Sequence, residues 1–332
     1  MKFLRDKGFL KLTHKPVLCN YYVTYRCNAK CSFCDIWEKP SPYITLQNAT
    51  QNLKDLKRLG VNVIDFTGGE PLLHRELPQL LTIAKSFGFI TTVTTNALLY
   101  PKMANKLKGL IDMLHFSLDS PIAQEHNESR GVQLFDKFEE SLTIAKQLGE
   151  CPDILFTVFS SNIHQIEEVY NTFCLPNNLM LILNPVFEYN DVGSNLSAAD
   201  LQLLKQWAHK PNVYLNEGFI TLRENGGNQI NNAVCNAAST TIVISPENKL
   251  VLPCYHLGLE SLAINDNLFD LWLSPNVQKL IAMEGKYPQC QGCTVNCYMQ
   301  PSFATELSPY FFKALYSTLK YNLKKGTWKE MV

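Results

Sequence analysis

Short runs of hydrophobic and β-branched residues recur between residues 17 and 210, and longer segments with a helical pattern separate them. The helical segments, such as 45–60 and 134–149, place hydrophobic residues three and four positions apart and end at glycine. Alternating strands and helices predict a parallel sheet with helices outside it. Six such units are fewer than the eight of a closed barrel, so we expect an α/β fold with a partial (β/α)6 TIM-type barrel over residues 17–225. The strand candidates are residues 17–25, 61–66, 89–95, 111–118, 154–159 and 179–187.

The pattern changes after about residue 225. Residues 224–232 are polar and rich in glycine and asparagine, and two short hydrophobic runs follow on either side of a Pro-Glu-Asn turn. We therefore expect a small cysteine-rich domain of a β-hairpin and helix over residues 226–302. Residues 1–16 are an N-terminal extension, and residues 303–332 are a basic helical tail with aromatic and leucine side chains on one side. We interpret this tail as a helix that packs on the barrel. The alternative is a helix that contacts a membrane peripherally.

Composition narrows the class of protein. The 332 residues include 30 basic and 30 acidic side chains, so no overall charge attracts nucleic acid, and no nucleic-acid partner is expected. No hydrophobic run in the sequence approaches the roughly 18 residues of a membrane-spanning helix, and the N-terminal segment lacks the continuous hydrophobic stretch of a signal peptide. These features predict a cytoplasmic protein.

Eleven cysteines point to metal, because clustered thiolates in a reducing compartment usually bind metal and rarely form disulfides. Cys27, Cys31 and Cys34 follow the first predicted strand directly with the spacing C-x3-C-x2-C. A zinc site or a ferredoxin-type cluster takes four protein ligands, and no fourth cysteine lies nearby in the sequence. Three ligands leave one iron of a four-iron cluster open to another molecule. We interpret the remaining cysteines of this half, Cys19, Cys151 and Cys174, as structural.

The segment YRCNAKCSFCDIW resembles the signature of the radical S-adenosylmethionine (SAM) superfamily, with Phe33 in the aromatic position. In that family three cysteines hold a 4Fe-4S cluster, and SAM chelates the fourth iron through its amino and carboxylate groups. An electron from the cluster then cleaves SAM to a 5'-deoxyadenosyl radical, while the protein positions the reactants. The resemblance implies a radical SAM enzyme that needs a reducing partner such as flavodoxin or ferredoxin.

Further matches follow the later strands. Residues 67–71, Thr-Gly-Gly-Glu-Pro, resemble the GGE motif that binds the SAM amino group, although a plain turn is the alternative. Ser117 and Asp119 end the fourth strand and become candidates for the ribose hydroxyls. Arg130 resembles the arginine that meets the SAM carboxylate, with an exposed loop arginine as the alternative. The SAM-binding candidates are Phe33, Gly68, Gly69, Glu70, Asn96, Ser117, Asp119, Arg130 and Asn162.

A second group of cysteines brackets the predicted hairpin, and as a generic pattern it fits zinc or iron–sulfur. The surrounding sequence looks like the SPASM or shortened twitch domain that follows many radical SAM barrels and carries auxiliary 4Fe-4S clusters. Five cysteines are too few for two clusters, so we expect one second cluster held by four of the five. If the ligands follow the pattern of a twitch domain, Cys297 is either not a ligand or replaces one of the other four cysteines. The five cysteines are Cys235, Cys254, Cys290, Cys293 and Cys297.

The substrate stays open at this stage. Only about sixteen residues precede the first strand, which favours a small-molecule biosynthetic substrate over a leader-bearing peptide, and the basic aromatic tail would suit a lipid or isoprenoid. A maturase that modifies a ribosomal peptide or protein side chain is the alternative. A non-catalytic iron–sulfur electron-transfer or scaffold protein is the alternative of another class. No catalytic side chain is assigned, and the candidates for substrate contact are His115, Asn184, Glu188 and Tyr189.

Overall fold

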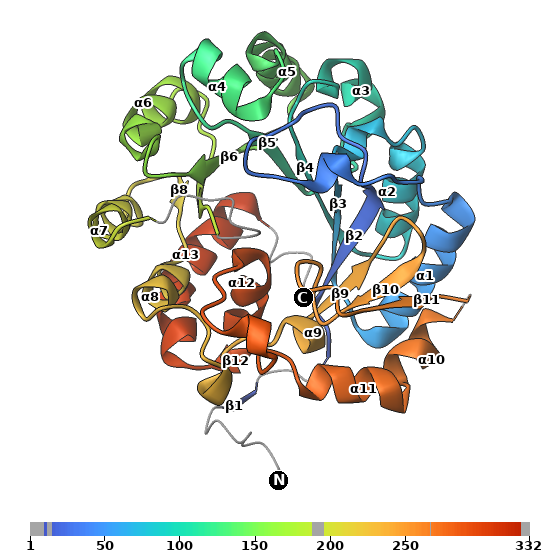
Figure 1. Ribbon diagram of the computed structural model, residues 1–332. Coiled ribbons are helices and arrows are strands. Elements are labelled where there is room, and N and C mark those ends of the chain that lie inside the picture. The colour runs from blue at the N-terminus through green and yellow to red at the C-terminus, as the bar shows by residue number, and fades with distance from the viewer. Residues whose placement is uncertain (1–9, 12–14, 188–195, 266, 327–332) are drawn as a thin grey trace.

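The computed structural model describes residues 10–11, 15–187, 196–265 and 267–326. Ten of its strands form one sheet in the order β11-β10-β9-β2-β3-β4-β5-β6-β7-β8, and helices surround it (Figure 1). Neighbouring strands from β9 to β8 are parallel, whereas β10 pairs antiparallel with β9 and β11. The sheet strands are β2 (Leu18–Thr24), β3 (Val63–Gly68), β4 (Ile90–Thr95), β5 (Met113–Ser117), β6 (Asp153–Val158), β7 (Leu181–Pro185), β8 (Val213–Tyr214), β9 (Thr241–Ile244), β10 (Lys249–Leu252) and β11 (Glu260–Ala263).

The main helices follow the hydrophobic pattern closely. Helix α1 begins after Thr45, whose side chain accepts from the Asn48 amide, and ends at Gly60 in the left-handed conformation, φ 92°. A short strand pair, β1 (Leu10–Lys11) with β12 (Glu306–Leu307), joins the two ends of the chain. The α-helices are α1 (Leu46–Leu59), α2 (Leu77–Ser86), α3 (Tyr100–Leu107), α4 (Ala123–Arg130), α5 (Phe135–Leu148), α6 (Ile166–Val169), α7 (Ala198–Trp207), α8 (Glu217–Glu224), α9 (Ala237–Thr240), α10 (Leu268–Leu273), α11 (Pro275–Ala282), α12 (Asn296–Ala304) and α13 (Pro309–Lys325).

The expected α/β fold is confirmed, and the sheet extends further than the six predicted units. All six predicted strands form, but β8 adds one more strand at one edge and β9 adds another at the opposite edge. Residues 241–244 pair in parallel with β2, so the hairpin expected in a separate domain continues the barrel sheet. The sequence of the hydrophobic run at 241–244 does not indicate its pairing. Such a run could pair only with its hairpin partner or also with a strand more than 200 residues earlier.

The two faces of the sheet differ in polarity and access to solvent. One face packs on the helices, as Ile64, Phe66 and Val93 join Leu53 and Leu56 of α1 in a fully buried core. Tyr22 on the opposite face joins Tyr298 and Met299 of α12 in a second buried cluster, but the other side chains on this face that alternate with the core are partly accessible. We call this set the inner face: Asp65, Thr67, Thr94, His115, Leu155, Thr157, Ile182 and Asn184.

Helices α12 and α13 lie on the open side of the barrel, between β8 and β9 (Figure 1). Tyr321 and Lys325 of α13 reach the buried carboxylate of Asp153 at the start of β6. The Tyr321 hydroxyl donates at 2.6 Å and the Lys325 ammonium lies at 2.5 Å. The tail helix therefore packs on the barrel. None of the helices within the described residues combines the length and hydrophobicity needed to cross a membrane.

Candidate active site

The loop with Cys27, Cys31 and Cys34 lies over the carboxyl ends of the barrel strands and is fixed from two sides. On one side, the amides of Gly69 and Glu70 donate to the carbonyls of Thr24 and Arg26 at 2.9 and 2.8 Å. On the other side, amides of the cysteine loop donate to the end of α4, with Lys30 to Arg130 at 2.9 Å. The backbone of the loop is therefore set by the sheet and by α4 before any metal binds.

The three thiols lie close enough to influence one another. Burial, with contributions from the neighbouring Cys31 and Cys34, raises the pKa of Cys27 to about 12, and burial also raises the pKa of Cys34. Burial and mutual repulsion make the thiolate forms of these cysteines unfavourable. A bound iron would stabilise the thiolates. Among the described residues, no group of three or more His, Cys, Asp or Glu side chains that could hold a metal ion is found. The three cysteines supply three sulfur donors on one loop, which is the donor type that a 4Fe-4S cluster takes.

Gly68 and Gly69 are required by contact with protein backbone. A Cβ atom on Gly68 would lie 1.9 Å from the Thr24 carbonyl oxygen, and one on Gly69 would lie 2.2 Å from that of Arg26. Gly68 also has φ 140°, which other residues rarely adopt. These glycines therefore let the end of β3 approach the cysteine loop.

Glu70 is buried and almost fully hydrogen-bonded. Its Oε1 accepts from the Leu72 amide at 3.0 Å and the Thr95 hydroxyl at 2.8 Å, and its Oε2 accepts from the Asn96 amide at 2.9 Å. Burial raises its pKa, while these hydrogen bonds and the nearby Arg130 oppose the rise. A carboxylate has about four acceptor positions, so one position remains for a donor such as an ammonium group.

Asn96 connects the end of β4 to the cysteine loop. Its side-chain amide donates to Oδ1 of Asn28 at 2.7 Å, and its own Oδ1 accepts from the Leu98 amide at 3.0 Å. Ser117 is buried at the end of β5, where the strand pairs with Leu155 of β6. The structure therefore brings Asn96 to the cysteine loop and places Ser117 one strand further along.

Arg130 is buried, so the alternative prediction of an exposed arginine in a loop is wrong. Its Nε lies 2.6 Å from Oδ2 of Asp119, one Nη lies 3.9 Å from the Cys31 sulfur, and its guanidinium stacks over the Phe33 ring at 5.3 Å. Burial alone would lower the pKa of Arg130, but the charge of Asp119 raises it above the ordinary value, so the guanidinium keeps its charge. Arg130 thus joins α4, β5 and the cysteine loop through one side chain.

Asp119 and Asn162 have structural partners. Oδ1 of Asp119 accepts from the Thr157 amide at 3.1 Å. The Asn162 side chain donates to the carbonyls of Asp119 and Thr157 at 3.0 and 2.9 Å, and accepts from the Phe159 amide at 2.8 Å. Asn162 therefore has little capacity left for the polar SAM contact that we expected, and its visible role is to join the ends of β5 and β6.

The second group of cysteines comes from separate segments that Asn228 ties together. This fully buried side chain donates to the carbonyls of Gly285 and Cys290 at 2.8 and 3.0 Å and accepts from the amides of Val234 and Cys235 at 3.0 and 3.2 Å. Its backbone amide donates to the Cys293 carbonyl at 3.0 Å. One asparagine thus fixes the backbones that carry three of the five cysteines.

The five thiols of this group affect one another electrostatically. Burial, with contributions from Cys293 and Cys290, raises the pKa of Cys254 to about 12. Burial also raises the pKa of Cys235 and Cys297, and for both of them Cys254 and Cys293 add to the rise. The Cys297 sulfur lies 3.9 Å from Nε2 of His256, whose pKa burial lowers to about 4. His256 is thus a partly buried neighbour of the group.

The substrate candidates have different outcomes. His115 is on the inner face, but its nitrogens contact Thr94 at 3.1 Å and Asp153 at 3.5 Å, so it belongs to a buried polar network. Asn184 is on the inner face and makes no side-chain hydrogen bond with the described residues. Glu188 and Tyr189 lie outside the described residues. Of the cysteines interpreted as structural, Cys19 and Cys174 are buried and Cys151 is exposed.

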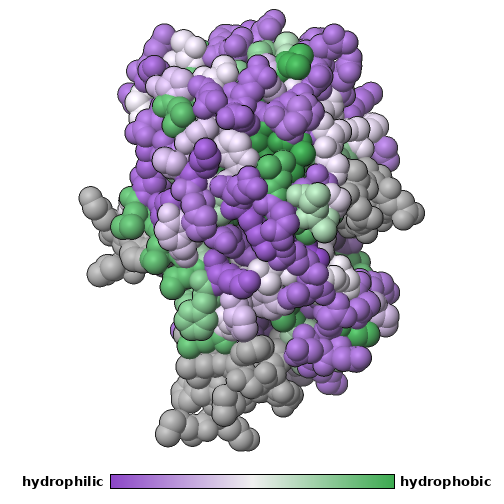
Figure 2. All heavy atoms as spheres, turned by 90° about the vertical axis from the view of Figure 1, so that its left-hand side faces the viewer, coloured by the Kyte–Doolittle hydropathy of each residue, from purple (hydrophilic) through white to green (hydrophobic). Residues whose placement is uncertain are grey.

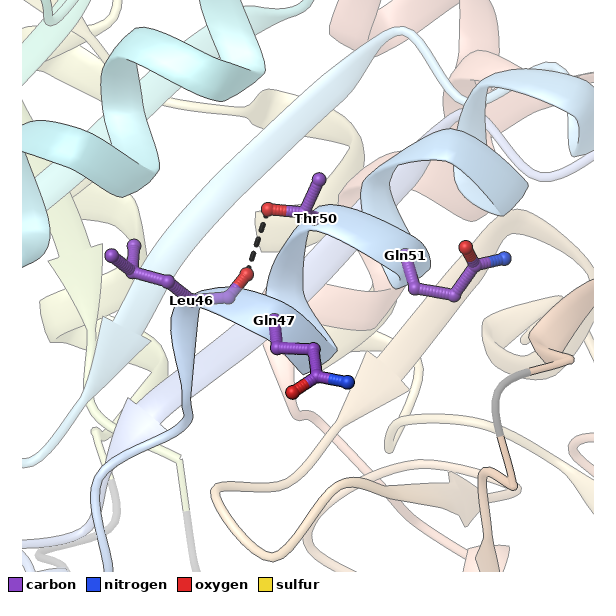
Figure 3. Close-up of a pocket in the computed structure, with 4 residues that line it drawn as sticks. All are labelled: Leu46, Gln47, Thr50 and Gln51. Atoms are coloured by element: carbon purple, nitrogen blue, oxygen red, sulfur yellow. Dashed lines mark hydrogen bonds between the residues drawn. The ribbon is translucent and has the colours of Figure 1, made fainter.

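A surface pocket lies on the first turns of α1, outside the barrel (Figure 3). Leu46, Gln47, Thr50 and Gln51 line it, and the Thr50 hydroxyl donates to the Leu46 carbonyl at 2.7 Å. It offers neither a thiol nor a charged side chain, so it is separate from the chemistry described above.

Comparison with known proteins agrees with this geometry. Residues 21–173 match the model of the radical SAM superfamily. These residues are a radical SAM domain. The match contains the cysteine loop, the Gly68-Gly69-Glu70 segment, Asn96, Arg130 and Asn162, and the chain is a radical SAM enzyme. The family implies a 4Fe-4S cluster and SAM.

The radical SAM domain has relatives with different names. A probable GTP 3',8-cyclase of Sulfurisphaera tokodaii is 28% identical over 66% of this chain and 76% of its own length. The Fe-coproporphyrin III synthase of Methanosarcina barkeri is 29% identical over 52% of this chain and 42% of its own length. Streptococcus suis SuiB, solved with the precursor peptide SuiA, has a similar fold with a TM-score of 0.66 and 21% identity, over 88% of this chain and 72% of SuiB. The likeness in fold therefore reaches beyond the barrel into the cysteine-rich region.

Several residues of the site were missed in the sequence. Asn28 could have been suspected because it lies between two cysteines, but His126 and Asn228 carry no local signal. His126 is fully buried and its Nδ1 accepts from the Asp119 amide at 3.2 Å. Asn228 lies in a stretch that reads as a linker, and only the folded chain brings its partners together.

Proposed function

We propose that this radical SAM enzyme binds its catalytic 4Fe-4S cluster through Cys27, Cys31 and Cys34 and acts on a small-molecule biosynthetic substrate inside the barrel. The observation that carries the proposal is the convergence of these three thiols with Glu70, Asn96 and Arg130 at the carboxyl ends of the strands. When bound, the cluster would supply the electron that cleaves SAM to a 5'-deoxyadenosyl radical.

The chain's own residues would position SAM beside that cluster. The open acceptor position of Glu70 suits the SAM amino group, since a carboxylate binds an ammonium through a charge-assisted hydrogen bond. Arg130 has donors beyond the two atoms that face Asp119 and Cys31, and these suit the SAM carboxylate. Asn96 and Ser117 are polar groups at neighbouring strand ends that suit the ribose hydroxyls, and the Asp119 carboxylate mainly holds Arg130.

We also propose a second 4Fe-4S cluster in the C-terminal region, held by Cys235, Cys254, Cys290 and Cys293. Asn228 joins the segments of Cys235, Cys290 and Cys293, and Cys254 is coupled electrostatically to Cys290 and Cys293. Cys297 instead faces His256. A cluster with four cysteine ligands would be suited to transferring an electron to or from the substrate.

The names of the two sequence relatives favour a small molecule, because each is named for one: GTP and Fe-coproporphyrin III. A peptide substrate is the second candidate, supported by the fold likeness to SuiB, which was solved with a precursor peptide. The proposal includes a cytoplasmic reductant such as flavodoxin or ferredoxin, because the cluster must receive an electron before SAM is cleaved.

Contact with a membrane, or a lipid or isoprenoid substrate, is supported by the exposed side of α13. Phe312, Tyr316 and Leu323 are 64%, 49% and 72% exposed, and lysines lie near them. The face that carries α7, α8 and α13 is otherwise mainly hydrophilic, with separate small hydrophobic groups (Figure 2). Cosedimentation with anionic liposomes tests this contact, and a protein that stays in solution at low salt would contradict it.

The main test is anaerobic reconstitution with iron and sulfide, followed by incubation with SAM and dithionite. We expect roughly eight irons per chain, four for each cluster, and formation of 5'-deoxyadenosine. Cys27→Ala should abolish 5'-deoxyadenosine formation and remove about half of the iron. Cys151→Ala, at an exposed cysteine outside both groups, is the matched control and should change neither value. A protein with intact clusters that never cleaves SAM would contradict the proposal and favour an electron-transfer role.

A further inference from the structure

Asp153 and Asp65 both lie on the inner side of the sheet, and their surroundings differ. Asp153 at the start of β6 is neutralised by Lys325 at 2.5 Å and Tyr321 at 2.6 Å, and His115 lies at 3.5 Å. Asp65 in the middle of β3 has no such partner. Among the described residues, no Lys, Arg or His side chain lies within ion-pair distance of Asp65, and its hydrogen bond is with Thr92.

The strand register places Asp65 within a polar part of the inner face. It pairs with Asn20 of β2 on one side and with Thr92 of β4 on the other, and both are polar. Asp65 and Thr67 are partly accessible, whereas Ile64 and Phe66 between and beside them are fully buried. Asp65 is therefore on the inner face of the sheet, where its side chain is partly accessible to another molecule.

An unpaired carboxylate in this position is costly for the protein. Burial raises the pKa of Asp65 to about 7, even though the Thr92 hydrogen bond opposes the rise. Taking a charged group out of water without a partner of opposite charge is strongly unfavourable, so such groups are normally paired. A ligand with a cationic nitrogen would supply the missing partner.

Asp65 is also close to the proposed SAM site along the strand. Thr67 follows it on the same face, and Gly68, Gly69 and Glu70 follow Thr67 directly. Two residues along a strand span roughly 7 Å, so a molecule held by Asp65 would lie just inside the strand ends that carry the SAM-binding candidates. On β7, across the interior, the side chain of Asn184 has no hydrogen-bond partner among the described residues and offers a second polar group.

We propose that Asp65 is the anchoring carboxylate for the substrate of this enzyme and that the substrate presents an ammonium or guanidinium group to it. The inference rests on the proposed function, since it takes the barrel interior as the substrate site. It excludes a substrate that points a phosphate or carboxylate at β3, because Asp65 would repel that anion. Asp65 determines specificity by charge, and no proton or electron transfer is assigned to it.

Binding of a small cationic probe tests the proposal without knowledge of the substrate. The reconstituted enzyme with SAM is titrated by calorimetry with n-butylammonium, with n-butylguanidinium and with the neutral alcohol n-pentanol. We expect both cations to bind at least tenfold more tightly than n-pentanol at pH 8, where Asp65 is mainly ionised. Equal affinities for the cations and the alcohol, or no binding of the cations, would overturn the proposal, and this comparison needs no variant.

The variant Asp65→Asn keeps the shape of the side chain and removes its charge. We expect it to lose at least tenfold in affinity for n-butylammonium, with its circular dichroism and iron content reported as checks of folding. Glu139→Gln, on the exposed side of α5, changes the net charge equally and should leave the affinity unchanged. If Asp65→Asn binds the cation as tightly as the wild type, Asp65 is not the anchor.

Formation of 5'-deoxyadenosine by the wild-type enzyme separates this inference from the proposed function. If the wild type does not cleave SAM, the proposed function fails. If the wild type cleaves SAM and does not distinguish the cations from n-pentanol, only the role of Asp65 fails.

Discussion

The two groups of cysteines reach their positions in different ways. Cys27, Cys31 and Cys34 lie within one loop of eight residues, and the backbone of that loop is fixed by hydrogen bonds to the end of β3 and the end of α4. The five cysteines of the second group come from segments spread over 63 residues, from Cys235 to Cys297. The buried side chain of Asn228 joins the segments of Cys235 and Cys290, and its backbone amide reaches the Cys293 carbonyl.

This difference shows which contacts each site depends on. The first group depends on a close approach between backbones, which only glycine allows at residues 68 and 69. The second group depends on one polar side chain whose hydrogen-bonding capacity is fully used. The first site should therefore be destroyed by a small added atom, and the second by the loss of a few hydrogen bonds.

The largest effect is expected for Gly69→Ala. The added Cβ would lie 2.2 Å from the Arg26 carbonyl oxygen and 2.5 Å from that of Tyr25, so the cysteine loop must move away from β3. We expect the rate of 5'-deoxyadenosine formation to fall at least a hundredfold and the first cluster to be lost. Iron analysis and the cleavage assay measure both effects.

Gly149→Ala is the matched control for this variant. Gly149 has φ 77°, yet nothing lies within 4 Å of a Cβ added there, so the change brings backbone strain without a collision. It should cost about 1 kcal/mol of stability and leave the cleavage rate unchanged. Normal cleavage by Gly69→Ala would show that the loop does not depend on this close approach.

The next largest effect is expected for Asn228→Ala, in the second group. Removing four side-chain hydrogen bonds leaves buried backbone groups unpaired, which should lower the free energy of unfolding by about 3 to 5 kcal/mol. Iron should fall by about half while SAM cleavage persists, because the first site does not use Asn228. The exposed neighbour Asn232, changed to Ala, should affect neither quantity. Full iron content in Asn228→Ala would refute the role of Asn228 as the organising residue.

A smaller effect separates the cysteines of the second group. Cys297 contacts His256, and Tyr22 and Asp65 of the barrel lie near enough to influence it, so we expect it to be the spare cysteine. Cys297→Ala should keep the iron of both clusters, whereas Cys293→Ala should lose that of the second. Electron paramagnetic resonance of the reduced proteins tests this, and loss of the second signal in Cys297→Ala would make Cys297 a ligand.

The sequence was informative wherever structure is decided locally. The alternation of hydrophobic residues located all six predicted strands, and the spacing of Cys27, Cys31 and Cys34 on one loop pointed to the catalytic cluster. Helix α1 begins and ends where its Thr45 cap and Gly60 indicate. These features depend on neighbours within a few residues.

Features that join distant segments could not be predicted. The pairing of β9 with β2 joins residues more than 200 apart, and no local pattern distinguishes it from an isolated hairpin. His115 resembles a residue at the mouth of the barrel, but Asp153 and the tail helix engage it. Arg130 resembles a surface residue in a polar helix, and only its pairing with Asp119 explains how its charge is buried.

The smallest effect concerns His126, which supports the first group from behind. It is fully buried, its Nδ1 accepts from the Asp119 amide, and burial together with the charge of Arg130 lowers its pKa to about 4. An unfolded histidine has a pKa of about 6.5, so below that pH the histidine binds a proton in the unfolded chain and stays neutral in the folded chain. Stability should therefore fall as the pH falls from about 6.5 toward 4, by up to about 1.4 kcal/mol per pH unit from this residue.

The variant His126→Gln removes the imidazole that binds this proton and retains a polar side chain. Urea unfolding of the iron-free protein at pH 7.5 and pH 5.0 should therefore show a smaller loss of stability in the variant than in the wild type. His115 and His256 remain in both proteins, so the difference isolates His126. Changing His209, whose side chain is 69% exposed, to Gln should leave the pH dependence unchanged.

An equal loss of stability in His126→Gln and the wild type would mean that His126 already binds a proton in the folded chain. The Asp119 amide could not then donate to its Nδ1, and the support behind Arg130 and Cys31 would have to come from Asp119 and Asn162 alone.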